Sequence, residues 1–195
     1  MPRPLVVAAA ATAAAWIPPV VFGLRWPDYR AARDFISELG AAGAPDAAAV
    51  NASFFIAGVL FVATCALIAR QRGGGRATVV LSLVSLVGWS YVAAAFAPCD
   101  SGCPAEGSAT QMLHNSVGGL GYLAGAVGLL LAAGTPAARR GPAWLAAVAG
   151  SVALASLIGM GAPELGDVRG AVQRLGEAAV FSWLLVEAYV VDRAR

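Results

Sequence analysis

The chain has 195 residues, of which 59% are hydrophobic and 12% are charged, and its formal net charge is +2. A soluble domain usually carries about 25% charged residues, so this composition excludes an ordinary soluble protein. The small net charge argues against nucleic acid as a partner. All thirteen basic residues are arginine, and alanine and glycine are abundant, which is typical of a GC-rich bacterial genome.

Six long apolar stretches alternate with short polar breaks. They cover Leu5–Leu24, Ala48–Ala69, Ala77–Ala97, Met112–Ala133, Ala143–Met160 and Ala171–Val191. Each has close to the twenty residues that cross about 30 Å of hydrocarbon at about 1.5 Å per residue. The sequence therefore predicts an all-α fold: a polytopic six-transmembrane-helix bundle that forms a single domain over residues 1–195.

The placement of arginine predicts the orientation of this bundle. With the N-terminus inside, the cytoplasmic pieces hold Arg3, Arg70, Arg72, Arg76, Arg139, Arg140, Arg193 and Arg195, and the outer loops hold Arg25, Arg30, Arg33, Arg169 and Arg174. This excess on the inner side follows the positive-inside rule. We therefore expect a multi-pass protein of the bacterial plasma membrane with both termini cytoplasmic.

The longest outer loop follows the first span. Within it, Tyr29–Leu39 is predicted to form a short helix, because Phe35, Ile36 and Leu39 share one side of such a helix and Gly40 is a plausible C-cap. We expect this helix to lie at the outer interface or to dip between the spans.

The fourth predicted span is rich in glycine. Gly121 and Gly125 have the small-xxx-small spacing that lets two helices approach closely. We favour tight packing inside one bundle, with a homo-oligomer through small-residue helix faces as the alternative. Aromatic residues near the span ends are interpreted as interfacial anchors; they are Trp26, Tyr29, Trp89, Tyr91, Trp144, Trp183 and Tyr189.

The outer segment from Cys99 to Cys103 allows two interpretations. A disulfide would close a tight loop in an oxidising outer compartment, and we favour it. The alternative is a metal site with Asp100 and His114 as further ligands, since zinc needs about four such ligands in tetrahedral array. Cys65 lies in the middle of a span and is interpreted as a small core hydrophobe.

Polar residues gather at the outer side of the predicted bundle, and ionisable residues at membrane depth are functional candidates. The predicted ligand-binding residues are Glu38, Asn51, His114, Arg174 and Glu177. Arg174 is expected to make a charge-assisted contact with Glu38 or Asp100, because a guanidinium at a span end needs a partner. His114 is the only histidine, and a neutral imidazole can serve as a base or a metal ligand.

Three functions compete for this cluster. The first, which we favour, is a pocket that binds a lipid or small amphiphile, with membrane lipids as partners and no cofactor. The second is a membrane-embedded hydrolase or transferase that uses His114 and Asp100, with Ser37 as nucleophile. The third is a small transporter, for which Glu177 and Glu187 are the nearest candidates for charge within the spans.

Several of these residues form a familiar set. Ile36-Ser37-Glu38-Leu39-Gly40 followed by Pro45, Asn51 and Gly58, then Phe96-Ala97-Pro98-Cys99-Asp100, His114 and Gly170-Ala171-Val172-Gln173-Arg174, run in order along the chain. The set resembles the bacterial membrane family called domain of unknown function 998. That resemblance implies six spans and an outer polar cluster, and it implies no known activity. A fainter likeness, to eukaryotic autophagy-modulator and lipid-remodelling membrane proteins, points towards lipids.

Overall fold

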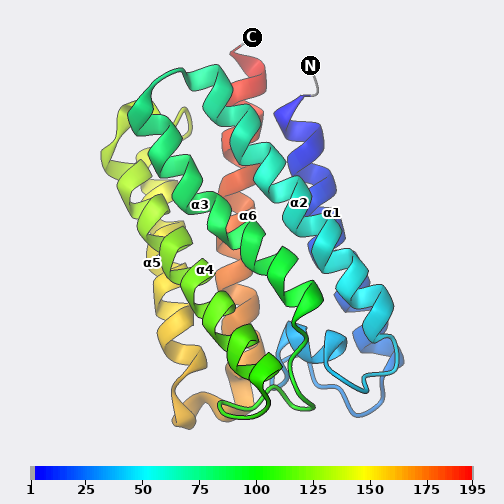
Figure 1. The fold of residues 1–195 in the computed structure, drawn as a ribbon. Helices are drawn as coiled ribbons and strands as arrows, with labels where there is room; N and C mark the ends of the chain where they lie inside the picture. The colour runs from blue at the N-terminus through cyan, green and yellow to red at the C-terminus, as the bar shows by residue number, and fades with distance from the viewer. Residues whose placement is uncertain (1–2, 195) are drawn as a thin grey trace.

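The computed structural model describes residues 3–194, which form six long helices arranged side by side (Figure 1). The helices are α1 (Pro4–Arg25), α2 (Ala47–Arg72), α3 (Gly75–Phe96), α4 (Ala109–Gly134), α5 (Ala143–Met160) and α6 (Arg169–Arg193). Short 3-10 helices stand between them: η1 (Ile36–Gly40), η2 (Pro136–Ala138) and η3 (Pro163–Val168). The all-α prediction is confirmed, and each predicted span falls on one of the six helices.

Five of these helices, α1 to α5, are long and apolar enough to cross a membrane. The chain is therefore an integral membrane protein. The sixth helix is also long, but Arg174, Glu177 and Glu187 interrupt its apolar stretch. The count of six spans therefore stays a prediction.

The helices close into a ring, since each packs against the next along the chain and α1 packs against α6. Both termini lie at one end of the bundle (Figure 1), which we call the terminal end. The opposite end, the loop end, consists of residues 26–46, 97–108 and 161–168. The two termini share one end because the chain runs through an even number of antiparallel helices.

Aromatic side chains of α2, α3 and α6 form the centre of the core. Phe181 packs edge-to-face against Phe61 and Tyr91, with ring centroids 5.3 and 5.9 Å apart. Trp183 is 1% exposed and Tyr91 is 9% exposed. The interpretation of these last two as interfacial anchors is wrong, because their positions on the helices point them into the bundle.

Glycine allows close approach of α3 to both of its neighbours. A Cβ atom on Gly58 would meet the carbonyl oxygen of Gly88, and a Cβ atom on Gly121 would meet the side chain of Ser90. A Cβ atom on Gly125 would meet Val87. Gly121 and Gly125 thus serve packing inside the bundle, as we favoured.

The first loop differs from its predicted form. Residues 31–33 form a turn, and only Ile36–Gly40 winds into a 3-10 helix. The Tyr29 hydroxyl donates to the Phe35 carbonyl oxygen at 3.0 Å, and the Glu38 carboxylate accepts the Phe35 amide at 2.9 Å. These side chains satisfy backbone groups that a longer helix would have paired, so an α-helix over Tyr29–Leu39 is not confirmed.

The terminal end is held together by Glu187 of α6, which is 1% exposed. Its carboxylate accepts hydrogen bonds from the backbone amides of Arg140 and Gly141, at 2.6 and 2.8 Å, and forms an ion pair with Arg72. One buried carboxylate thus ties α6 to α2 and to the connection between α4 and α5.

Candidate functional site

A disulfide lies at the loop end. Cys99 and Cys103 are bonded, with their Cα atoms 5.1 Å apart, and Cys65 is a buried free thiol. Both predictions are confirmed. The backbone amide of Ala42 donates to the Cys99 carbonyl oxygen at 2.9 Å, so the disulfide loop is also joined to the first loop.

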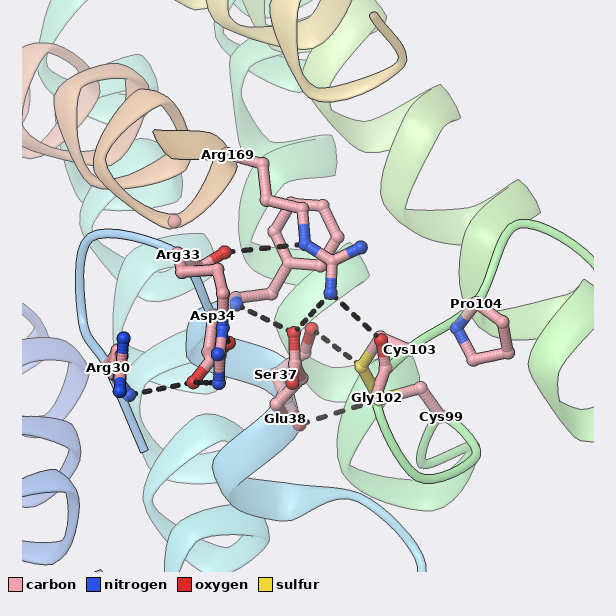
Figure 2. A network of polar contacts seen from close by, with 12 residues as sticks. Arg30, Arg33, Asp34, Ser37, Glu38, Cys99, Gly102, Cys103, Pro104 and Arg169 are labelled. Carbon is pink, nitrogen blue, oxygen red and sulfur yellow. Dashed lines mark hydrogen bonds and ion pairs between the residues drawn. A yellow bond between two sulfur atoms is a disulfide. The ribbon is translucent and has the colours of Figure 1, made fainter. Parts of the chain in front are cut away.

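Arg169, at the start of α6, connects three segments of the loop end (Figure 2). Its Nη2 donates to Glu38 Oε1 at 3.0 Å and to the Gly102 carbonyl oxygen at 3.1 Å. Its guanidinium carbon lies 4.5 Å from the centroid of the Phe35 ring. We did not single out this arginine from the sequence, where nothing distinguishes it from the other arginines of the predicted outer loops.

Arg174 does not contact a carboxylate among the described residues, so its predicted contact with Glu38 or Asp100 is wrong. It donates instead to the carbonyl oxygens of Asp34 and Gly170, both at 3.0 Å, and to the Tyr29 hydroxyl. Five residues along a helix is a little under one and a half turns, so Arg174 and Arg169 leave α6 in different directions. Arg174 contacts Tyr29 and Asp34 of the first loop, whereas Arg169 contacts both Glu38 of the first loop and Gly102 of the disulfide loop.

Asp100 interacts with the start of α4 and makes no hydrogen bond to His114. Its carboxylate accepts the amide and the hydroxyl of Ser108, both at 2.8 Å. These two hydrogen bonds lower the pKa of Asp100 below its usual range. Its own amide donates to Gln111 Oε1 at 2.7 Å. Asp100 thus organises the turn before α4.

Two other groups of the first loop have shifted pKa values. Burial raises the pKa of Tyr29, against the opposing effect of Arg174. Burial alone would raise the pKa of Asp34, but hydrogen bonds from Arg33 and from the Arg30 amide hold it below its ordinary value. Asp34 is therefore a charged group that fixes the loop backbone.

His114 lies beside the disulfide. Its Nδ1 donates to the Ala97 carbonyl oxygen at 2.8 Å, which leaves Nε2 as an acceptor in the neutral ring. The Cys99, Cys103 and His114 ligand atoms lie within 4.8 Å of one another. The two sulfur atoms are bonded to each other, however, and Asp100 is occupied by Ser108. This arrangement does not fit the four-ligand metal site that we considered.

An open cleft of about 600 Å³ runs along this end of the bundle. Its walls come from η1, the disulfide loop, α4, the end of α5 with η3, and the start of α6. A smaller pocket of about 70 Å³, which we call the inner chamber, is lined by residues of η1, α2, α3, α4 and α6. The cleft and the inner chamber share Ser37, His114, Gly118, Tyr122 and Gln173, so one leads into the other.

Glu177 lines the inner chamber. It is 4% exposed, and its Oε1 accepts a hydrogen bond of 2.6 Å from the Tyr122 hydroxyl. Tyr91 interacts with the same carboxylate. We did not predict either tyrosine as a partner; the signal in the sequence is that a tyrosine deep in an apolar span needs a hydrogen-bond partner for its hydroxyl.

The cleft and inner chamber bring together only some of the predicted site residues. His114, Glu177 and Ser37 line them, whereas Glu38, Asn51, Arg174 and Asp100 do not. Asn51 donates to the Gly40 carbonyl oxygen at 2.9 Å and so fixes the end of η1. Gln173, which accepts the Ile36 amide at 2.6 Å, is a lining residue that we had not placed in the site.

A catalytic arrangement is not assembled among the described residues. The Ser37 hydroxyl lies 3.4 Å from Cys103 Sγ, and no histidine or carboxylate in residues 3–194 is hydrogen-bonded to it. A serine nucleophile needs such a base within about 3 Å. Ser37 therefore has no such base as a hydrogen-bond partner among the described residues.

The fold defines a helical integral membrane protein with a cleft at one end of its bundle. Residues 7–190 match the family described as protein of unknown function (DUF998), and the chain belongs to that family. No curated protein and no solved structure matches the chain.

Proposed function

We propose that this protein binds a lipid or a small amphiphile in the cleft at the loop end. The proposal rests on the lining of the cleft, one part of which is apolar and the other polar. Leu157 and Met160 of α5 form an apolar wall, and Ser37, His114 and Gln173 provide polar groups where the cleft meets the inner chamber. An amphiphile has the same division between tail and head.

The cleft is accessible from the lipid-facing side of the bundle. Gly118 and Gly119 line it, and no atom lies within 4 Å of a Cβ built on either. Next to them, Leu120 is 66% exposed and Ile158 is 67% exposed, as residues that face hydrocarbon are. A lipid tail therefore has an open path between α4 and α5.

If both termini are cytoplasmic, as the arginine placement predicts, this site lies at the outer leaflet. The proposal takes α6 as a sixth span, because it completes the ring and returns the C-terminus to the terminal end. The arginine excess at the terminal end favours cytoplasmic termini, and the composition favours a bacterial plasma membrane. A C-terminal tag should be inaccessible in intact cells and accessible after lysis; a tag readable from outside would reject this orientation.

Binding is tested by filling the cleft. Gly118→Leu adds an apolar side chain where there is open space, and Gly134→Leu adds the same side chain at the terminal end of the same helix, also in open space. In nanodiscs with a diazirine-bearing phospholipid, peptides of α4 and α5 that line the cleft should be labelled in the wild type. Gly118→Leu should reduce this labelling and Gly134→Leu should not. Equal labelling of all three proteins would contradict the proposal.

His114 gives a second test of binding against catalysis. His114→Gln retains a hydrogen-bonding side chain, and His114→Ala does not. Binding should persist in part with glutamine and fall further with alanine, whereas a catalytic base would lose its function with both. The measurement is lipid profiling of a deletion strain complemented with each variant. Full complementation by both variants would show that His114 takes no part in binding.

A further inference from the structure

We propose that the inner chamber takes a primary ammonium group, so that the ligand of the cleft is an amphiphile with an amine head. This rests on the proposed function and specifies the chemistry of its ligand. The cleft holds the apolar part of the molecule, and Glu177 receives the cation.

The buried carboxylates of this protein differ in whether they have a cationic partner. Asp34 pairs with Arg33, Glu38 with Arg169 and Glu187 with Arg72. Each of these three carboxylates therefore has a guanidinium partner. Glu177 is as deeply buried, yet it has no arginine or histidine within ion-pair distance in residues 3–194. A buried carboxylate without a cation is costly, and a bound ammonium would provide the missing charge.

The walls around Glu177 are aromatic. The rings of Phe54, Tyr91 and Tyr122 line the inner chamber, and the Phe54 and Tyr91 rings meet edge-to-face with centroids 5.7 Å apart. Aromatic faces attract cations, most strongly where water is excluded. The Ser90 hydroxyl, which donates to the Val87 carbonyl oxygen, keeps a lone pair that can accept an N–H.

The acceptors around the inner chamber favour a primary ammonium over a quaternary one. Glu177 and Ser90 line the chamber and can accept N–H hydrogen bonds, which a primary ammonium donates and a trimethylammonium group does not. The rest of the head would lie among Ser37, Gln173 and Arg169 of the cleft, where Arg169 is 29% exposed and can meet an anionic group such as a phosphate.

The experiment compares lipid heads with one acyl composition. The full chain in phosphatidylcholine nanodiscs is labelled with a diazirine-bearing phosphatidylethanolamine, and labelling is competed with phosphatidylethanolamine, phosphatidylcholine, diacylglycerol or a long-chain alkylamine. The wild type should prefer the ethanolamine lipid over the choline lipid by about tenfold, or about 1.4 kcal/mol. Competition by the alkylamine as well would assign the preference to the ammonium alone; competition only by the lipid would show that the phosphate is also recognised.

The variant Glu177→Gln removes the charge and keeps an acceptor for Tyr122. It should still label the cleft, but more weakly than the wild type does with this ethanolamine lipid, and it should lose its preference among head groups. Glu164→Gln, at an exposed carboxylate of η3, should keep the preference. Equal competition by all heads in the wild type would overturn the inference whether or not the variant folds. A preference that survives in Glu177→Gln would overturn it too. It would show that the Glu177 carboxylate is neutralised by a proton and not by a bound ammonium.

This outcome is distinct from failure of the proposed function. If the protein binds no amphiphile in the cleft, labelling does not saturate and Gly118→Leu has no effect. If it binds one without recognising an amine, labelling saturates, Gly118→Leu reduces it, and the heads compete equally.

Discussion

The guanidinium of Arg169 donates a hydrogen bond of 3.0 Å to the carboxylate of Glu38, across 131 residues of sequence. Glu38 also accepts the amide of Phe35, and Arg169 also donates to the Gly102 carbonyl oxygen. The pair therefore holds η1, the disulfide loop and the start of α6 together beside the cleft.

Arg169→Ala should lower the stability of the protein in detergent. The change leaves the Glu38 carboxylate, which is buried, without its cation, and a hydrogen bond to a charged group contributes about 1.5–3 kcal/mol. We expect a loss of about 2 kcal/mol in the free energy of unfolding. Arg30→Ala is the matched control. The Arg30 side chain is exposed, and its hydrogen bond to Asp34 comes from the backbone amide, which alanine retains. Additive losses in a double-mutant cycle with Glu38→Gln would contradict a direct pair.

Arg174→Lys should loosen the first loop. Lysine keeps the positive charge but lacks the planar fork that reaches Asp34, Gly170 and Tyr29 together. A local loss of about 1.4 kcal/mol raises the open population about tenfold, and cleavage by trypsin at Arg30 and Arg33 should accelerate by that factor. Unchanged cleavage would show that the loop does not depend on Arg174. The control is Arg25→Lys, at the end of α1.

The pH dependence of stability should carry a contribution from Asp100. Because the hydrogen bonds from Ser108 lower the folded-state pKa of Asp100, its contribution is complete above the unfolded pKa of about 3.9. It is lost as the pH falls through the folded-state pKa. Asp100→Asn should therefore be less stable than the wild type at pH 7, and the difference should disappear in acid. Ser108→Ala removes one hydrogen-bond donor to Asp100 and the N-cap of α4. In this background, the difference in stability between aspartate and asparagine at position 100 should be smaller. A difference independent of pH would refute this account.

Gly58→Ala should destabilise the contact between α2 and α3. Its Cβ atom would meet the carbonyl oxygen of Gly88, which is backbone and cannot rotate away. Overpacking of this kind costs typically about 1–3 kcal/mol. Gly134→Ala, where a Cβ atom meets open space, should leave the melting temperature unchanged or raise it. Equal melting temperatures for the two variants would mean that the helices separate at little cost.

The sequence by itself determined the helices of this protein. Hydrocarbon offers no partner for a free amide or carbonyl, so each long apolar stretch must be helical, and α5 begins and ends at Ala143 and Met160 as predicted. The disulfide followed from two cysteines four residues apart in a loop predicted to be outside the membrane. These features depend on local composition and spacing, which the sequence alone shows.

Only the tertiary structure decided which side chains meet at the loop end. Arg169 and not Arg174 reaches Glu38, and Glu177 meets Tyr122 of another helix. Both outcomes depend on the rotation of α6 about its axis, which is set by packing against α1, α2 and α5 together. A chain of similar apolar helices carries no local signal for that rotation, so the partners of its polar residues emerge only when the helices pack.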